Sequence, residues 1–267
     1  MGVLNVTPDS FAENTRLDAG TAVAAGVRME QDGADIIDVG GESTRPDATA
    51  VPLEEELSRV LPVVRELARR VQVPISVDTY KAEVARAALD AGATLVNDIS
   101  GLQYDPSLGA VVASRRAAIV LMHTRGRPQT MYAEARYDDA AVEVVKELRA
   151  AMTRALAAGI ERDAVIVDPG IGFAKRPEHS YGVLARLADI GPPLDRPLLV
   201  GPSRKSFMRQ AVADRPAPQR DWGTAAAVTA AVLGGAHIVR VHAVAEMVQV
   251  MRVAEEIRRA MLTTGEP

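Results

Sequence analysis

Short apolar runs, mostly β-branched, alternate along the whole chain with longer amphipathic segments, and this alternation constrains the fold more than any other feature. The predicted strands are 3–6, 35–40, 75–78, 94–98, 118–123, 164–168, 197–201 and 237–242. Most are almost continuously apolar, as expected for strands buried on both faces of a parallel sheet. The predicted helices are 20–33, 53–70, 81–92, 106–116, 139–159, 178–190, 222–235 and 244–262. Segment 53–70 carries apolar residues every three or four positions, as an amphipathic helix requires.

Eight strand–helix units in a chain of about 250 residues favour a closed (β/α)₈ TIM barrel. An open, doubly wound sheet is the alternative, because it also alternates strands and helices, but it seldom contains eight such even units. No linker rich in Pro, Gly and Ser divides the chain. The sequence therefore predicts an α/β protein with a single barrel domain over residues 1–267.

Composition excludes several classes of protein. With 48% hydrophobic and 25% charged residues the chain can bury a large core, and with 3% aromatic residues that core must consist of Ala, Val, Leu and Ile. The absence of cysteine excludes disulfides, thiolate metal sites and cysteine nucleophiles. A net charge of −4 lacks the basic surface that nucleic-acid binding needs. No signal peptide or membrane-length apolar run is visible, so we expect a cytoplasmic protein with neither nucleic-acid nor membrane partners.

Every predicted strand ends in side chains that can form hydrogen bonds or carry charge. In a barrel of this kind the C-terminal ends of the strands form one rim, and active sites lie there. One polar residue at a strand end is usually turn chemistry, but eight ends of eight indicate a functional site. These residues are Asn5, Glu42, Ser43, Thr44, Arg45, Asp78, Asn97, Asp98, His123, Asp168, Ser203, Arg204, Lys205, Ser206, Arg240 and His242.

The rim residues fall into two chemical groups. The acceptor-rich group is Asp78, Asn97 and Asp168, which suits a planar heterocycle carrying N–H and NH₂ groups. The donor group is Arg45, Arg240 and His242, which suits phosphate oxygens. Structural roles stay open for the same side chains: the carboxylates could cap helices or turns, and the arginines could form salt bridges at the rim.

Lys205 is one of four lysines in a chain whose other 27 basic residues are arginine. It lies between Ser203 and Ser206, where a helix following the seventh strand would present free N–H groups and its dipole to an anion. A compact ammonium can donate to a ring nitrogen or carbonyl, while a serine hydroxyl holds a carboxylate. Phosphate binding is the alternative, because the seventh and eighth loops of barrels often bind phosphate.

Eight segments together resemble those of bacterial dihydropteroate synthases, in order and in spacing, from residue 1 to about 256. The segments are MGVLNVTPDSF, DIIDVGGESTRP, SVDT, VNDISG, LMHTRGRPQTM, DPGIGFAK, GPSRKS and HIVRVH. The resemblance implies a pterin-binding barrel that condenses 6-hydroxymethyl-7,8-dihydropterin pyrophosphate with p-aminobenzoate. The products would be 7,8-dihydropteroate and pyrophosphate, in a Mg²⁺-dependent step of folate biosynthesis that passes through a pterin cation.

The same resemblance implies a role for each matched residue. The pterin would contact Asp78, Asn97, Asp168 and Lys205, with Ile99 and Met122 lining the pocket and Arg204 stacked on the ring. The pyrophosphate would contact Asn5, Thr44, Arg45, Arg240 and His242, with Mg²⁺ close to Asn5. The p-aminobenzoate would contact Ser206, Phe173, Lys205, Phe11 and Pro46. Catalysis would depend on Asp9, Asp168 and Lys205, and two chains would form a homodimer through their last helices.

The chain departs from the family pattern at a few positions. Residues 12–15 are Ala-Glu-Asn-Thr where the family usually has Ser-Asp-Gly-Gly, and the loss of glycine should stiffen a loop expected to close over the site. Asp47 follows ESTRP where the family has Gly, and Ala243 replaces an Asp. The chain begins at the first strand, where relatives carry extra residues that help to cover the barrel floor.

Two other functions compete with the synthase. A methyltetrahydrofolate-binding barrel of a corrinoid methyltransferase system shares the acceptor-rich rim, but it needs no clamp for pyrophosphate such as Arg45, Arg240 and the SRKS segment. A catalytically silent pterin-binding paralogue is the second alternative, although every residue needed for activity outside the first loop is present. Four scattered histidines predict no zinc site.

Overall fold

The computed structural model describes residues 1–7, 19–43 and 49–263. Five predicted site residues lie outside these ranges: Asp9, Phe11, Thr44, Arg45 and Pro46. Residues 12–15 and Asp47 also lie outside them. Their predicted roles therefore stay predictions.

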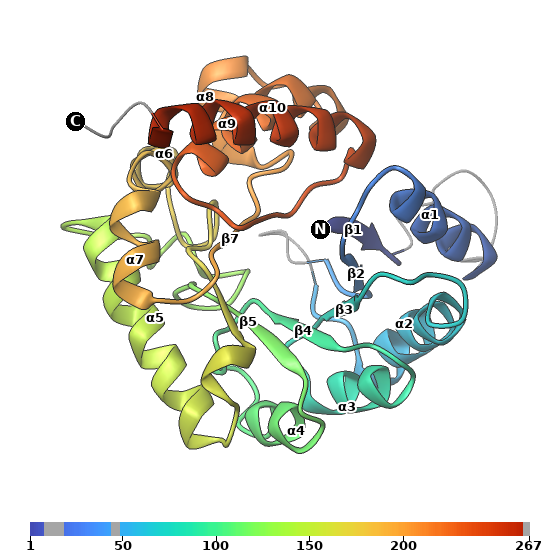
Figure 1. Cartoon of the computed structure of the whole chain (residues 1–267). Coiled ribbons are helices and arrows are strands. Elements are labelled where there is room, and N and C mark those ends of the chain that lie inside the picture. The colour runs from blue at the N-terminus through green and yellow to red at the C-terminus, as the bar shows by residue number, and fades with distance from the viewer. Residues whose placement is uncertain (8–18, 44–48, 264–267) are drawn as a thin grey trace.

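All eight predicted strands and the amphipathic helices between them are present (Figure 1). The strands are β1 (Gly2–Asn5), β2 (Ile37–Gly40), β3 (Ile75–Asp78), β4 (Leu95–Asp98), β5 (Ala118–Met122), β6 (Val165–Asp168), β7 (Leu199–Val200) and β8 (Ile238–Val239). The helices are α1 (Ala19–Gln31), α2 (Leu53–Leu67), α3 (Ala82–Asp90), α4 (Leu108–Ser114), α5 (Ala140–Ala157), α6 (Pro177–Ala185), α7 (Gly191–Leu194), α8 (Arg209–Val212), α9 (Asp221–Leu233) and α10 (Val244–Thr263).

The predicted helix 178–190 is interrupted in the structure. It consists of α6 and a 3₁₀ turn at Leu187–Asp189, and the four-residue α7 follows. Gly191 and two prolines occupy the start of α7, where proline's missing N–H costs nothing because the first turn of a helix has no partner for it.

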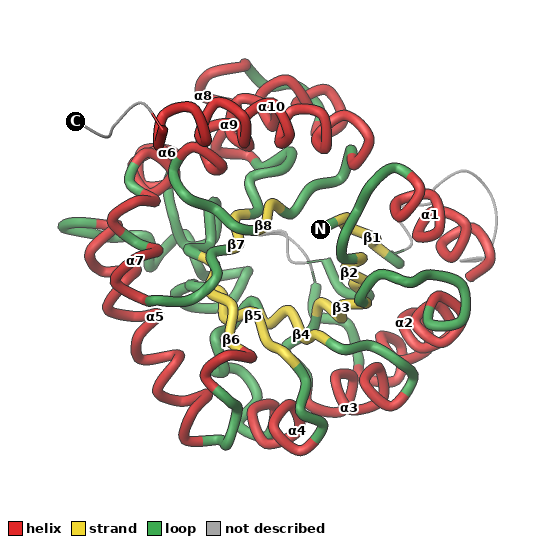
Figure 2. Tube along the Cα trace, viewed as in Figure 1, coloured by secondary structure: helices red, strands yellow, loops and turns green. Residues whose placement is uncertain are grey.

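The strands are parallel throughout and form a ring. Strands β1 to β6 pair in chain order in one sheet, and β7 pairs with β8 in a second sheet. Two parallel bridges, Val167 with Leu198 and Gly2 with Val241, join the sheets at both ends. Backbone hydrogen bonds from Val3 N to Val241 O (2.9 Å) and from Val241 N to Met1 O (3.0 Å) support the second junction. Figure 2 shows the strands at the centre with the helices outside them, which confirms the predicted (β/α)₈ barrel.

The pleat of the strands divides the apolar side chains into two cores. Successive residues of a strand point to opposite faces, so in β5 Val120 belongs to the core inside the barrel, whereas Ile119 and Leu121 belong to the larger core between strands and helices. The buried side chains of the inner core are Met1, Leu95, Val120 and Leu199. The inner core is small because the strands are short, and it fills only one end of the barrel.

The inward-facing positions change from apolar to polar toward the C-terminal ends of the strands. In β4, Leu95 of the inner core is followed two residues later by Asn97. In β6, Ile166 packs on the same core and is followed two residues later by Asp168. Because a spacing of two keeps side chains on one face, this order places polar groups at the rim, directly above an apolar floor.

Among the described helices, none combines the length and the apolar character that crossing a bilayer requires.

Two helical glycines test how closely the outer helices pack. A Cβ added at Gly109 of α4 would lie 2.7 Å from the Ala158 Cβ, whereas a Cβ at Gly182 of α6 would meet no atom within 4 Å. We expect Gly109→Ala to lower the free energy of unfolding by about 1–3 kcal/mol, because the alanine methyl group cannot rotate away. The control Gly182→Ala should raise it by about 0.5–1 kcal/mol through helix propensity. Urea unfolding measures both, and equal effects would contradict this packing.

Candidate active site

A buried charge network occupies the mouth of the barrel. Arg240, which follows β8, donates from Nε to Asp38 Oδ2 and from a terminal nitrogen to Asp78 Oδ2, both at 2.6 Å. Asn97 donates from Nδ2 to the same Asp38 oxygen at 2.9 Å. The Asp38 side chain is completely buried and that of Arg240 is 19% exposed. The network links the inward positions of β2, β3, β4 and β8, so it holds four sides of the ring together.

These contacts test the helix-cap alternative for Asp78, and the predicted pterin contact of Asp78 stays a prediction. Helix α3 begins after Lys81, and the N–H of its first residue, Ala82, donates to Asp105 Oδ2 at 2.8 Å and not to Asp78. The Asp78 carboxylate points to Arg240 instead, which excludes the helix-cap alternative. The alternative for Arg240, a salt bridge, is what the structure contains, and the predicted contact of Arg240 with pyrophosphate stays a prediction.

Asp38 is the residue that sequence reasoning missed. It lies within the run DIIDVG, between the outward-facing Ile37 and Val39. A charged residue at an inward position of an otherwise apolar strand was the available signal, because burying a carboxylate without a partner is very costly. The strand-end criterion could not find it, since Asp38 lies two residues before the end of β2.

Asp168 has a structural contact and also faces the site. Its Oδ1 accepts a hydrogen bond from Gly170 N at 2.7 Å, which confirms the turn role that the sequence left open. Burial raises the pKa of Asp168, and the positive charge of Lys205 opposes this shift. Met122 pairs with Asp168 in the register of β5 and β6. Met122 and Ile99 are both buried, at 3% and 4% exposure, so apolar side chains border the predicted pterin contacts.

Lys205 lies against the loop that follows β6. Its Nζ donates to Ile171 O at 2.6 Å and is 4.5 Å from the centre of the Phe173 ring. Gly172 lies at φ +80°, and a Cβ there would be 3.1 Å from Lys205 Cδ, so glycine leaves room for the lysine stem. The predicted neighbours Lys205, Phe173 and Asp168 are therefore brought together.

The helix expected after the seventh strand is too short to bind an anion through its dipole. Ser206 is exposed and begins a three-residue 3₁₀ turn, Ser206–Met208, followed by the four-residue α8. Such short elements align few peptide dipoles. An anion at Ser206 would depend on the hydroxyl and on Lys205 more than on a helix dipole.

Two pKa shifts at the barrel mouth have opposite directions. Burial raises the pKa of Asp78 to about 7, although the charge of Arg240 opposes the shift. Burial lowers the pKa of Lys205 to about 8, although the charge of Asp168 opposes it. Desolvation penalises the charged form in each case, so both groups titrate within reach of neutral pH.

The remaining predicted donors already have protein partners. Arg204 donates from two nitrogens to the two Asp221 oxygens, each at 2.7 Å, so its guanidinium is paired with α9. His242 Nδ1 lies 2.9 Å from Ser203 Oγ. Burial and the nearby Arg240 lower the pKa of His242 to about 3, so it offers a neutral imidazole. The stacking predicted for Arg204 and the phosphate contact predicted for His242 stay predictions.

Asn5 ends β1 beside Gly40 and is half-buried. Within residues 1–7, 19–43 and 49–263, no three His, Asp or Glu side chains are grouped so that they could hold a metal ion. A single amide oxygen fits a Mg²⁺ ion that is bound mainly by phosphate oxygens and water, which is how Mg²⁺ is often held.

Comparison with known proteins agrees with this geometry. A profile of the family described as "Pterin binding enzyme" matches residues 1–242. Dihydropteroate synthase of Synechocystis is 47% identical over 261 residues, which is 97% of this chain and 90% of that protein. The enzyme of the same name from Escherichia coli is 46% identical over 259 residues, 96% of this chain and 90% of that protein.

Solved structures of dihydropteroate synthases also superpose closely on this chain. Yersinia pestis dihydropteroate synthase in a sulfonamide drug complex superposes with a TM-score of 0.91 at 42% identity, covering 97% of this chain and 93% of that one. Xanthomonas albilineans dihydropteroate synthase in complex with 7,8-dihydropteroate gives a TM-score of 0.86 at 37% identity, covering 100% and 93% of the two chains.

The charge network predicts a large stability cost for Asp38. Removing one partner of a buried ion pair typically costs about 3–5 kcal/mol, so Asp38→Ala should lower the free energy of unfolding by that amount. The control is Asp32→Ala, which breaks the surface pair of Asp32 with Arg28, whose side chain is 74% exposed. Its cost should stay below about 1 kcal/mol. Chemical unfolding compares the two, and similar costs would show that the network contributes little.

Proposed function

The chain belongs to the dihydropteroate synthase family, and from this premise we propose which of its residues hold each substrate. It is an enzyme, a transferase of folate biosynthesis that condenses 6-hydroxymethyl-7,8-dihydropterin pyrophosphate with p-aminobenzoate. The methyltetrahydrofolate alternative loses its basis, because relatives almost half identical over nine-tenths of their length are synthases. The observation that carries the assignment of residues is the set of buried acceptors at the ends of β3, β4 and β6.

The pterin occupies the mouth of the barrel, above the apolar floor. Asp78, Asn97 and Asp168 accept hydrogen bonds from its ring N–H and NH₂ groups, and Lys205 donates to a ring acceptor. Arg240 supports this proposal indirectly, because it fixes one Asp78 oxygen and keeps the carboxylate turned into the barrel. Ile99 and Met122 cover the apolar edge of the ring.

The p-aminobenzoate lies beside Phe173 and Lys205, with its carboxylate directed to Ser206. The contact between the Lys205 ammonium and the Phe173 ring supports a subsite with one aromatic and one cationic side. A Xanthomonas albilineans relative has been solved with 4-aminobenzoic acid, and the Yersinia pestis relative is in a sulfonamide drug complex. We propose that both classes of compound bind here, with Phe11 and Pro46 as further predicted contacts.

The pyrophosphate and Mg²⁺ lie near Asn5, at the end of β1. Asn5 would supply an amide oxygen to the ion, and the predicted phosphate contacts are Thr44, Arg45, Arg240 and His242. When bound, Mg²⁺ would neutralise charge on the departing pyrophosphate. A neutral His242 would donate a hydrogen bond to a phosphate oxygen without adding charge.

The reaction needs little acid–base chemistry from the protein. The bond between the pterin methylene carbon and the pyrophosphate oxygen breaks with both electrons leaving on oxygen. The carbon then bonds to the aniline nitrogen, and the acidic anilinium that results loses its proton to solvent. The Asp168 carboxylate, with Asp9 as a predicted second one, would stabilise the cation-like carbon electrostatically. The family resemblance predicts that segments 7–11 and 40–46 close over the site, which would keep water from capturing that carbon.

The exposed surface of the last helices supports a proposal about assembly. Apolar side chains are exposed on the last helices, notably Trp222 of α9 and Val253, Ile257 and Leu262 of α10. Helices α9 and α10 pack against one another, so these side chains lie on neighbouring elements. We propose that they form a homodimer interface and that the enzyme acts in the cytoplasm.

Turnover tests the proposed function. Purified protein is mixed with the pterin pyrophosphate, p-aminobenzoate and Mg²⁺, and release of pyrophosphate is followed together with dihydropteroate. We expect equal rates of release, loss of both with EDTA and recovery with added Mg²⁺. Pterin binding without formation of either product would favour the silent paralogue. An unchanged rate in the presence of EDTA would contradict the role of Mg²⁺.

The two pKa shifts predict a bell-shaped pH profile for kcat/KM of the pterin substrate. Activity should rise through about pH 7 as Asp78 ionises and fall above about pH 8 as Lys205 loses its proton. Lys205→Arg should weaken the alkaline limb, because arginine does not titrate there. A remaining limb is expected from Lys175, whose pKa burial lowers to about 7. The activity of Lys205→Arg at pH 7.5 should fall by about tenfold or more, since a buried charge-assisted hydrogen bond is misplaced.

The matched control is Lys146→Arg on the exposed face of α5, which should keep the wild-type profile. Full turnover by Lys205→Arg, or an alkaline limb that is unchanged in size and midpoint, would contradict the role of Lys205.

A further inference from the structure

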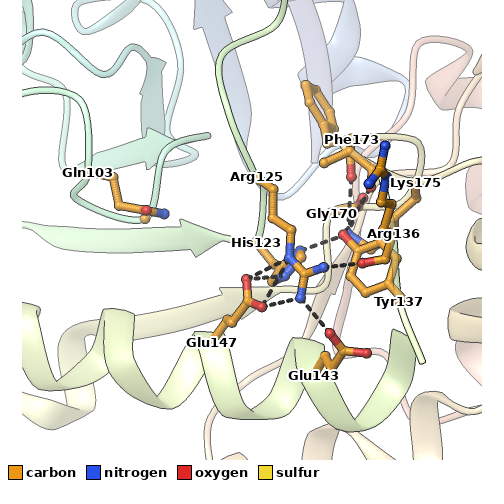
Figure 3. Close-up of polar contacts among 12 residues, drawn as sticks. Gln103, His123, Arg125, Arg136, Tyr137, Glu143, Glu147, Gly170, Phe173 and Lys175 are labelled. Atoms are coloured by element: carbon orange, nitrogen blue, oxygen red, sulfur yellow. Dashed lines mark hydrogen bonds and ion pairs between the residues drawn. The ribbon is translucent and has the colours of Figure 1, made fainter. Parts of the chain in front are cut away.

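A second buried lysine lies behind the site. Lys175 follows β6 and is 1% exposed. Its Nζ is 2.8 Å from His123 Nδ1 and 3.1 Å from each of the carbonyl oxygens of Gly170 and Phe173 (Figure 3). An ammonium has three N–H groups, so these three acceptors satisfy it completely. None of the substrate contacts proposed above involves Lys175.

The protons of the neighbouring groups can be assigned from the same contacts. Burial and Lys175 lower the pKa of His123 to about 4, so its ring is neutral. Since Nδ1 accepts from Lys175, the ring proton lies on Nε2 and is donated to Glu147 Oε2 at 3.0 Å. Glu147 is also paired with Arg125. Burial acts to raise the pKa of Glu147, but the bonds from His123 and Arg125 outweigh it and lower that pKa to about 2.

The loop around Lys175 has a backbone that needs support. Gly170, Gly172 and Ala174 have positive φ values of 67°, 80° and 48°. The left-handed conformation costs an L-residue such as alanine roughly 1–2 kcal/mol. Two contacts oppose this cost: Lys175 gathers the carbonyls of Gly170 and Phe173, and Tyr137 donates from its hydroxyl to Ala174 O at 2.9 Å.

The same loop carries two residues proposed to contact the substrates, Asp168 and Phe173, and the Ile171 carbonyl that holds a third, Lys205. Gly170 N donates to Asp168 Oδ1, Ile171 O accepts from Lys205, and the Phe173 ring lies under the Lys205 ammonium. The orientations of the Gly170 N–H, the Ile171 carbonyl and the Phe173 ring depend on the peptide planes at residues 170–173. Two of those planes carry the carbonyls that Lys175 binds, so a change at Lys175 reaches both substrate subsites.

We propose that Lys175 is a positioning residue of the synthase reaction, which holds loop 168–175 in the shape that presents Asp168, the Ile171 carbonyl and Phe173. The hydrogen-bonded series Arg125–Glu147–His123 orients the Lys175 ammonium from the outer side of the barrel. This inference rests on the proposed function of the site. Removing the ammonium would also leave the three buried acceptors without a donor, so the experiments below separate positioning from stability.

The first experiment compares Lys175→Met with Lys146→Met, the same substitution at an exposed position of α5. We expect Lys175→Met to stay folded by circular dichroism and to raise the KM values of both substrates by about tenfold or more, with a smaller change in kcat. Loss of contacts made equally in the ground and transition states acts on KM. Lys146→Met should keep wild-type constants.

Milder variants keep the test decisive if Lys175→Met does not fold. His123→Asn retains an acceptor near the position of Nδ1, whereas His123→Leu has none, so KM should rise more for leucine than for asparagine. Tyr137→Phe keeps the ring that lies 4.0 Å from the Arg125 guanidinium and loses only the bond to Ala174 O. It should raise KM a few-fold.

Wild-type protein assayed in parallel separates the possible failures. If the wild type forms no dihydropteroate, the proposed function fails and this inference fails with it. If the wild type turns over while Lys175→Met and His123→Leu keep its KM values, the inference alone fails. Variants that lose thermal stability with unchanged KM would likewise show a merely structural lysine.

Discussion

The closure of eight parallel strands into a ring is the constraint on which the rest of this structure depends. Closure sends every second side chain of each strand into a narrow interior. The apolar half of that interior, around Leu95, Val120 and Leu199, is filled by ordinary packing. The polar half cannot be filled in that way, because each buried charge needs a partner. The barrel mouth is therefore the part of the interior where a polar ligand can bind.

The charge network around Arg240 meets this requirement while leaving acceptors for a substrate. Arg240 divides its donors between Asp38 and Asp78, and Asn97 shares an oxygen of Asp38. Asp38 lies deepest and is completely buried, whereas Asp78 and Asn97 stand nearer the rim. A guanidinium suits this position because its flat fork reaches two carboxylates at once.

The loop after β6 meets a similar requirement by a different route. Its carbonyls turn toward one buried ammonium, that of Lys175, and so its other face is left to carry Asp168, the Ile171 carbonyl and Phe173. Lys175 and Lys205 thus contact the same loop through different carbonyls, those of Gly170 and Phe173 for Lys175 and that of Ile171 for Lys205. Both pKa values are lowered by burial, to about 7 and about 8 respectively.

The sequence by itself determined the order of the strands and helices, the barrel, and the acceptors and Lys205 at the strand ends, because periodicity and position within a strand are local properties of the chain. It did not reveal Asp38 or Lys175, and it left the roles of Asp78 and Asp168 open between turn, cap and binding site. Only the tertiary structure decided the contacts of these residues, because the partners of Arg240 lie 202 and 162 residues away and that of Lys175 lies 52 residues away. Such pairings depend on which strands the closed ring places opposite one another. A local sequence pattern does not encode contacts between residues so far apart in the chain.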